Sequence, residues 1–241
     1  MPVPASLQLP HSVRQHLFAD EAQTAQALAA MVADALGAGL RARGAAVLFV
    51  SGGSTPVAFM QALSQQALDW SKVTVSLADD RWVAADDADS NEHLVRQHLL
   101  RGPAAAARFL PLVNIALAPE QQLAAAEQAL AQLPHPADAV VLGMGDDGHT
   151  ASLFPGAPGT AAALDRRLPQ RLALVTPATA PHRRISLTLR ALFDTRLLAI
   201  LLGGDSKRAA IEGAARGTAE QHPVAAVLQQ DGVPVQLFYN P

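Results

Sequence analysis

The sequence contains no cysteine, so the chain can hold neither a disulfide framework nor a thiolate nucleophile or thiolate zinc site. Its 18 lysines and arginines are dispersed and the formal net charge is −3, which leaves no basic footprint for nucleic acid or an anionic membrane. No apolar run approaches the ~18 residues of a membrane-spanning helix, and the first residues lack the regions of a signal peptide. We expect a soluble, cytoplasmic protein that binds neither nucleic acid nor membrane.

Charged residues are also scarce, at 16% of the chain, whereas 50% of the residues are hydrophobic. This composition supplies a large core and is not typical of a disordered chain. The sequence has no internal repeat and no proline- or serine-rich linker, so residues 1–241 are predicted to form a single domain. No pattern specifies an oligomeric state.

Apolar runs alternate with amphipathic stretches along the chain. Asp20, with Gln23 three residues later, resembles a capping box for a long helix that ends near Gly44. Further helices are predicted over residues 56–68, from a cap at residue 89 or 90 to about 100, and over 119–133. Strands are predicted over residues 16–19, 46–50, 73–78, 109–113, 139–142, 172–175, 197–202 and 235–239. The fold class is therefore α/β with a mostly parallel sheet.

The stretch DAVVLGMGDDGHTASLFPG, residues 138–156, joins a buried strand to a cluster of glycines, carboxylates and one histidine. Asp146, Asp147 and His149 follow the carboxyl end of a predicted parallel strand, where open α/β sheets place their ligands. The glycines match the pattern G-x-G-x-x-G, but an acidic pair inside that loop would repel the pyrophosphate of a dinucleotide. A carboxylate beside an imidazole suits proton transfer better.

A second glycine-rich turn, residues 51–56, follows the predicted strand at 46–50. Its sequence is Ser51-Gly52-Gly53-Ser54-Thr55-Pro56. Ser54 or Thr55 can cap the next helix, and the proline suits its first turn. A helix N-terminus with available N–H groups is a phosphate cradle, although no lysine follows as in a P-loop. A well-capped strand-to-helix turn without a ligand is the alternative.

Other strand ends also carry charge. Asp79 and Arg81 follow the strand at 73–78; taken alone they are typical of a surface ion pair, and only the recurrence of polar residues at strand ends favours a site. Lys207 falls in the first turn of a helix after two glycines, where the helix dipole disfavours a cation unless it meets a negative ligand. Arg184 precedes another strand and suits either an anion or solvent.

These motifs resemble those of the 6-phosphogluconolactonases. The family's S-G-G-S-T-P loop is present at residues 51–56, and its D-E-R segment at 79–81 is followed by Ser90-Asn91. The signature G-M-G-x-D-G-H-T-A-S-L-F-P occupies residues 143–155 without a break. The R-I-S-L-T segment lies at 184–188, and the late lysine is Lys207. One departure is that the middle acid of D-E-R is the shorter Asp80.

The resemblance implies a modified doubly wound, Rossmann-like α/β fold with helices on both faces of a mostly parallel sheet, as in glucosamine-6-phosphate deaminase and ribose-5-phosphate isomerase. It implies hydrolysis of a sugar-phosphate lactone, 6-phospho-D-glucono-1,5-lactone, to 6-phosphogluconate in the oxidative pentose phosphate pathway, with no cofactor and no metal. His149 is then the general base toward water, and Asp147 is a candidate to orient it. The substrate and its phosphate are assigned to Ser51, Gly52, Gly53, Ser54, Thr55, Asp79, Arg81, Arg184 and Lys207.

Two other functions compete with this interpretation. The glucosamine-6-phosphate deaminase/isomerase of the same fold reads G-H-I-A-F-N-E-P at the central motif, whereas residues 148–155 here contain no glutamate. A non-enzymatic sugar-phosphate sensor would carry a DNA-binding module or a basic patch, and neither is visible in the sequence.

Overall fold

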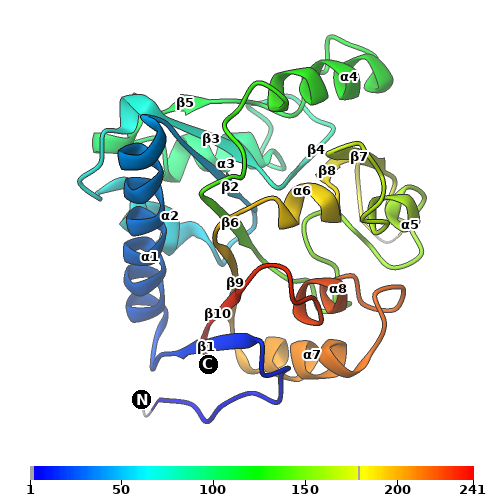
Figure 1. Ribbon diagram of the computed structural model, residues 1–241. Coiled ribbons are helices and arrows are strands. Elements are labelled where there is room, and N and C mark those ends of the chain that lie inside the picture. The colour runs from blue at the N-terminus through cyan, green and yellow to red at the C-terminus, as the bar shows by residue number, and fades with distance from the viewer. Residues whose placement is uncertain (1–2, 179) are drawn as a thin grey trace.

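The computed structural model describes residues 3–178 and 180–241, and helices alternate with strands along them (Figure 1). In chain order the elements are β1 (Val13–Leu17), α1 (Glu21–Arg43), β2 (Ala46–Val50), α2 (Val57–Ser64), the 3₁₀ helix η1 (Trp70–Lys72), β3 (Val73–Leu77), β4 (Asp79–Arg81), α3 (Asn91–His98), the 3₁₀ helix η2 (Gly102–Ala106), β5 (Arg108–Phe109), α4 (Pro119–Leu130), β6 (Ala139–Leu142), α5 (Thr160–Ala163), β7 (Leu172–Val175), β8 (Arg184–Leu187), α6 (Leu189–Phe193), β9 (Leu198–Gly203), α7 (Asp205–Arg216), α8 (Val224–Leu228) and β10 (Val235–Asn240).

Seven strands form one sheet in the order β1-β10-β9-β6-β2-β3-β5. Every neighbouring pair in it is parallel, which confirms the predicted α/β class. From β2 the chain adds β3 and β5 on one side, and from β6 it adds β9 and β10 on the other. The strand order thus reverses between β2 and β6, and open α/β sheets bind ligands in the crevice at such a switch point.

Helices cover both faces of this sheet (Figure 1). Helix α1 packs against β2, β6 and β10, and α7 packs against β9. As predicted, α1 begins where the Asp20 carboxylate accepts the Gln23 N–H at 2.9 Å, and it ends at Gly44, whose φ is 71°. The side chains of β2 and β6 are all buried, because parallel strands lie between two helical layers.

A second sheet, of three antiparallel strands in the order β4-β8-β7, lies beside the first and was not predicted. Residues 79–81 were expected as the polar end of a strand, but they form β4, which pairs with β8. The Leu187 N–H donates to the Ala78 carbonyl at 2.8 Å, so the end of β8 lies beside the end of β3. This pairing places Arg81 directly opposite Arg184.

Several predicted boundaries were wrong. Strand β1 occupies residues 13–17 and not 16–19, because it pairs along its whole length with β10. Helix α2 stops at Ser64 and not at 68, because the N–H groups of the next two residues bond to carbonyls three residues back. Ala67, within the predicted helix, lies beyond its end and is exposed. Strand β5 comprises only Arg108–Phe109, so of the predicted 109–113 a single residue lies in a strand.

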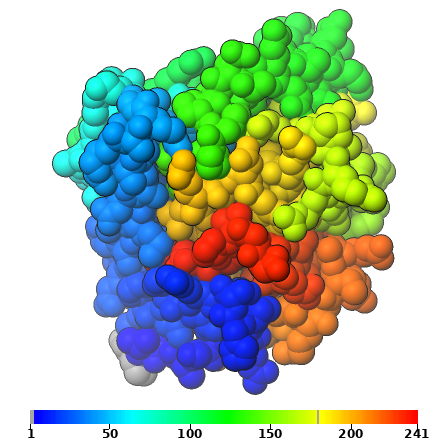
Figure 2. Space-filling view, in the orientation of Figure 1, coloured from blue at the N-terminus to red at the C-terminus, as the bar shows by residue number. Residues whose placement is uncertain are grey.

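The first and last strands in the chain, β1 and β10, are neighbours in the sheet. Val13 pairs with Val235 and Leu17 with Tyr239. The space-filling view shows the dark-blue N-terminal segment against the red C-terminal segment (Figure 2). Within residues 3–178 and 180–241, no helix is both long and apolar enough to cross a membrane.

Candidate active site

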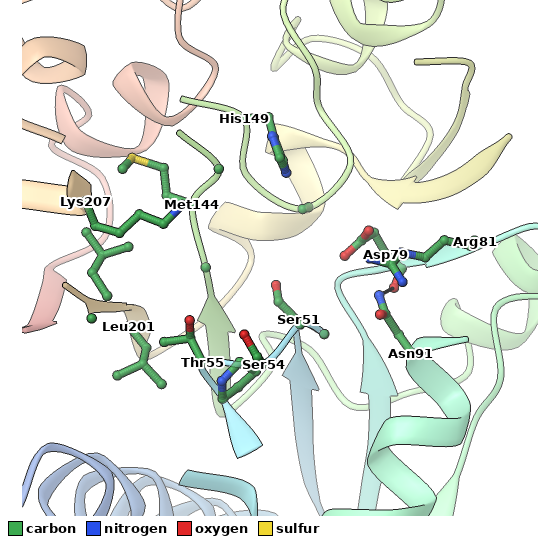
Figure 3. A pocket seen from close by; sticks show the side chains of 18 of the residues that line it. Ser51, Ser54, Thr55, Asp79, Arg81, Asn91, Met144, His149, Leu201 and Lys207 are labelled. Atoms are coloured by element: carbon green, nitrogen blue, oxygen red, sulfur yellow. Dashed lines mark hydrogen bonds between the residues drawn. The ribbon is translucent and has the colours of Figure 1, made fainter. Parts of the chain in front are cut away.

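The carboxyl ends of β2, β3, β6 and β9 surround a cavity of about 270 Å³ (Figure 3). Every predicted substrate-binding residue lines it together with His149, whereas Asp147 contacts His149 from outside the lining. Side chains project into the cavity from several directions, with His149 opposite the Ser51 turn and Lys207 on the far side from Arg81 (Figure 3). The full lining is Ser51, Gly52, Gly53, Ser54, Thr55, Pro56, Asp79, Arg81, Asn91, Gly143, Met144, Gly145, His149, Ala151, Arg184, Leu201, Leu202, Gly203 and Lys207.

His149 and Asp147 form a hydrogen-bonded pair in the turn after β6. The Asp147 Oδ1 lies 2.6 Å from the His149 Nδ1 and also accepts the His149 backbone N–H at 3.0 Å. Burial acts to raise the pKa of Asp147, but these bonds from His149 outweigh it and hold that pKa below the ordinary 3.8. Because a carboxylate only accepts, the Nδ1 carries the proton and the Nε2 is left as a proton acceptor.

The plane of the His149 ring is fixed by its neighbours. It stacks on Phe154 with ring centroids 4.0 Å apart and 25° between the planes. The turn passes so close to the imidazole that a Cβ at Gly145 would lie 2.1 Å from its Nδ1, so only glycine fits there. The Arg184 guanidinium lies over the same Phe154 ring, 5.1 Å from its centroid. The sequence analysis did not identify Phe154 as part of the site.

Arg81 and Arg184 are cross-strand partners on β4 and β8. Burial first, and then the charge of Arg81, lower the pKa of Arg184. Like charges directly opposite each other destabilise a sheet, and the Nε of both arginines is buried without a hydrogen-bond partner among the described residues. Two cations that repel each other beside a cavity are suited to an anionic ligand.

Asp79 is buried, with 4% of its surface exposed, and its carboxylate accepts the Ser152 hydroxyl. The alternative of a surface ion pair between Asp79 and Arg81 was therefore wrong. The sequence analysis also missed Ser152, which lies within hydrogen-bonding reach of Arg184, at 3.5 Å. An ordinary A-S-L context gives no sign of such a role.

The Ser51 turn lines the cavity as predicted, but its capping role was wrong. Helix α2 has Pro56 as its N-cap residue and no side-chain capping bond. A backbone bond from the Val57 N–H to the Ser54 carbonyl, at 3.2 Å, closes the turn instead. The Ser54 and Thr55 side chains face the cavity, and the Ser51 Oγ is buried with no partner among the described residues (Figure 3).

Lys207 reaches the cavity from the first turn of α7. Its Nζ lies 2.8 Å from the Asp146 carboxylate, whose side chain is 75% exposed. An exposed ion pair of this kind contributes little and can be exchanged for another anion. An adjoining cavity of about 460 Å³ is lined by Asp20 and Glu21, whose carboxylates disfavour an anion there.

A family model described as glucosamine-6-phosphate isomerases/6-phosphogluconolactonase matches residues 19–236. The chain belongs to this family. A 6-phosphogluconolactonase of Pseudomonas aeruginosa is 43% identical over 98% of this chain and 99% of its own, and one of Neisseria meningitidis is 44% identical over 93% and 97%. The crystal structure of a 6-phosphogluconolactonase from Shewanella baltica superposes with a TM-score of 0.92 at 38% identity, covering 98% of this chain and 100% of the other.

The middle residue of the family's D-E-R segment, Asp80, lies behind the cavity and not in its lining. Its carboxylate accepts the backbone N–H of Asn91 at 2.7 Å and of Glu92 at 3.3 Å, at the start of α3. Asn91 in turn donates to the Asp79 carbonyl and packs against Gly52. Asp80 thereby positions Asn91, which lines the cavity but was not among the predicted site residues. The Ser90-Asn91 pair at the start of a helix was the sequence feature that pointed to it.

Burial raises the pKa of Asp80 to about 6, against the opposing effect of the backbone N–H groups that bond to it. Between pH 4 and 6 the native state binds a proton that the unfolded chain releases, so this group makes stability increase as pH falls. We expect the unfolding free energy of the wild type, relative to that of Asp80→Asn, to rise by about 2 kcal/mol from pH 7 to pH 4. Urea titrations at both pH values measure it. Asp34→Asn, on the exposed face of α1, is the control, and a difference that does not change with pH would contradict the prediction.

Proposed function

We propose that this protein hydrolyses 6-phospho-D-glucono-1,5-lactone to 6-phosphogluconate, the lactone step of the oxidative pentose phosphate pathway, in the cytoplasm. The observation that carries the proposal is the His149–Asp147 pair at a cavity that also contains Arg81, Arg184 and Lys207. The cavity thus contains a candidate general base, His149, together with cations that suit a phosphate. Membership of the family, with relatives named 6-phosphogluconolactonase over nearly the whole chain, supports the same activity.

In the proposed reaction the His149 Nε2 accepts a proton from water while the water oxygen attacks the lactone carbonyl. The tetrahedral intermediate then collapses and the ring C–O bond breaks. The protonated imidazole returns its proton to the departing ring oxygen, so the sum is addition of one water across the ester. Asp147 keeps the proton on Nδ1 and stabilises the imidazolium that forms, and Phe154 holds the ring plane.

The phosphate is assigned to the Ser51–Thr55 turn together with Arg184 and Lys207. A dianion suits two cations and a turn whose Ser51 hydroxyl has no partner among the described residues. It would exchange with Asp146 for the Lys207 ammonium, which the exposure of that carboxylate permits. Arg81 and Asp79 line the side of the cavity away from Lys207 and are assigned to the sugar, or to the carboxylate of the product (Figure 3).

The decisive experiment follows hydrolysis of freshly generated lactone by acid release and subtracts the spontaneous rate. We expect turnover with the phosphorylated lactone and no ammonia from glucosamine 6-phosphate. Ammonia release would favour the deaminase. Binding of 6-phosphogluconate without any turnover of the lactone would favour a sensor and overturn the proposal.

We also expect the activity to be independent of metal. No group of three histidine, aspartate or glutamate side chains within residues 3–178 and 180–241 is arranged to hold a metal ion. A cation on His149 would occupy the nitrogen that must accept the proton of water. Hydrolysis should therefore survive exhaustive EDTA treatment and gain nothing from Zn²⁺, Mg²⁺ or Mn²⁺. Loss with EDTA and recovery with one of these ions would also remove His149 as the base.

A further inference from the structure

The turn after β6, residues 143–149, holds the His149–Asp147 pair and is called the catalytic turn below. His222 contacts this turn from a distant part of the chain. It lies just before α8, and its Nδ1 is 3.1 Å from the backbone carbonyl of Asp147. A carbonyl only accepts hydrogen bonds, so His222 must donate from Nδ1. This bond falls on the peptide group next to the carboxylate that orients His149.

The surrounding backbone fixes His222 in this position. Its own N–H donates to the Thr218 carbonyl at 2.8 Å, and its carbonyl accepts the Ala225 N–H at 2.8 Å. Two residues on, the Val224 N–H donates to the Gly148 carbonyl at 3.0 Å. The segment 222–224 therefore holds the two peptide groups that join Asp147 to His149.

Two glycines make room for the imidazole. A Cβ at Gly148 would lie 2.7 Å from the His222 Cβ and Nδ1, and one at Gly217 would lie 2.8 Å from its Cδ2. Gly148 also has a φ of 81°, so glycine is needed there both for the turn and for the contact. The partly exposed ring thus lies between the catalytic turn and the end of α7.

We propose that His222 is a positioning residue for the lactonase reaction: its Nδ1–H holds the Asp147 carbonyl, and through it the Asp147–His149 pair. This inference rests on the proposed function. His222 does not line the cavity, and it acts without exchanging a proton with substrate. The Nδ1–H is present in both the neutral ring and the imidazolium, so the bond does not depend on the charge of His222.

The test compares His222→Asn with His222→Leu. The two side chains have the same branched shape, but only the asparagine amide can donate to the Asp147 carbonyl. We expect kcat to fall about 10-fold or more in the leucine variant with KM within about twofold, since small misplacements of catalytic groups are costly. The asparagine variant should recover most of the rate. His11→Leu, at the opposite end of the strands, is the control.

Two further measurements make the result specific. In the His149→Asn background, His222→Leu should cause no additional loss of rate, because it acts through His149. Nitrogen-15 shifts of the His149 ring should show a smaller population of the Nδ1–H tautomer in the leucine variant and the wild-type population in the asparagine variant. If the leucine variant fails to fold, His222→Ala takes its place. Equal rates or equal His149 shifts in the two variants would overturn the inference, whereas an inactive wild type with the expected shifts would overturn only the proposed function.

Discussion

Substitution of asparagine for His149 is expected to abolish most catalysed hydrolysis. Among the described residues His149 is the only histidine that lines the cavity, and general-base catalysis contributes about 10²–10⁴ in rate. Asparagine retains a donor toward the Asp147 carboxylate but provides no comparable base. The fall should therefore appear in kcat, as measured by acid release from fresh lactone after subtraction of the spontaneous rate.

The folded state and the binding of product should survive this change. His149 is partly exposed, with 28% of its side chain accessible, so its loss leaves no large cavity. We expect the His149→Asn protein to melt near the wild-type temperature and to bind 6-phosphogluconate with similar affinity. His11→Asn serves as the matched control on an exposed histidine. Full activity in the His149 variant would remove the proposed base and leave the Asp147 contact without a catalytic purpose.

Substitution of alanine for Lys207 is expected to weaken phosphorylated ligands selectively. A hydrogen bond to a charged group contributes about 1.5–3 kcal/mol, so 6-phosphogluconate should bind about 10- to 100-fold more weakly. The kcat/KM for unphosphorylated gluconolactone should change little, because this lactone has no phosphate to contact the Lys207 ammonium. Titration calorimetry for the product and kcat/KM for both lactones give the comparison.

The chain provides a matched control for this experiment. Its other lysine, Lys72, pairs with Asp69 at the amino end of β3, away from the cavity. Lys72→Ala should leave both ligands unaffected. Equal losses for phosphorylated and unphosphorylated lactone in Lys207→Ala would show that Lys207 does not contact the phosphate, and would leave that role to the Ser51–Thr55 turn and Arg184.

Local patterns were sufficient to predict the parts of the site that are local in the chain. Glycines and polar residues that interrupt an apolar run marked the turns after β2 and β6, and Asp147 lies only two residues from His149. The same local reasoning failed for Ser54 and Thr55, where a capping rule predicted a bond within the turn. A serine or threonine at such a turn can either cap the helix that follows or face the ligand cavity. The sequence does not show which of the two its side chain does.

Contacts between distant segments could not be predicted. Nothing in the sequence around Arg81 indicates that β4 pairs with β8 and places Arg81 opposite Arg184, because the two strands lie far apart in the chain. The bond between His222 and Asp147 is of the same kind. A lone histidine before a proline is typical of an exposed turn, and only the folded chain shows that it reaches the catalytic turn.

The pairing of the first strand with the last also determines when the sheet can be completed during synthesis. β1 has β10 as its neighbour in the sheet, so Val13 to Leu17 can take their places only after residues 235–239 have been made. A chain halted before that point leaves the edge of β9 uncovered. Such an open edge of apolar strand can pair with other chains. Synthesis of residues 235–239 therefore separates a nascent chain prone to aggregation from one whose sheet can close.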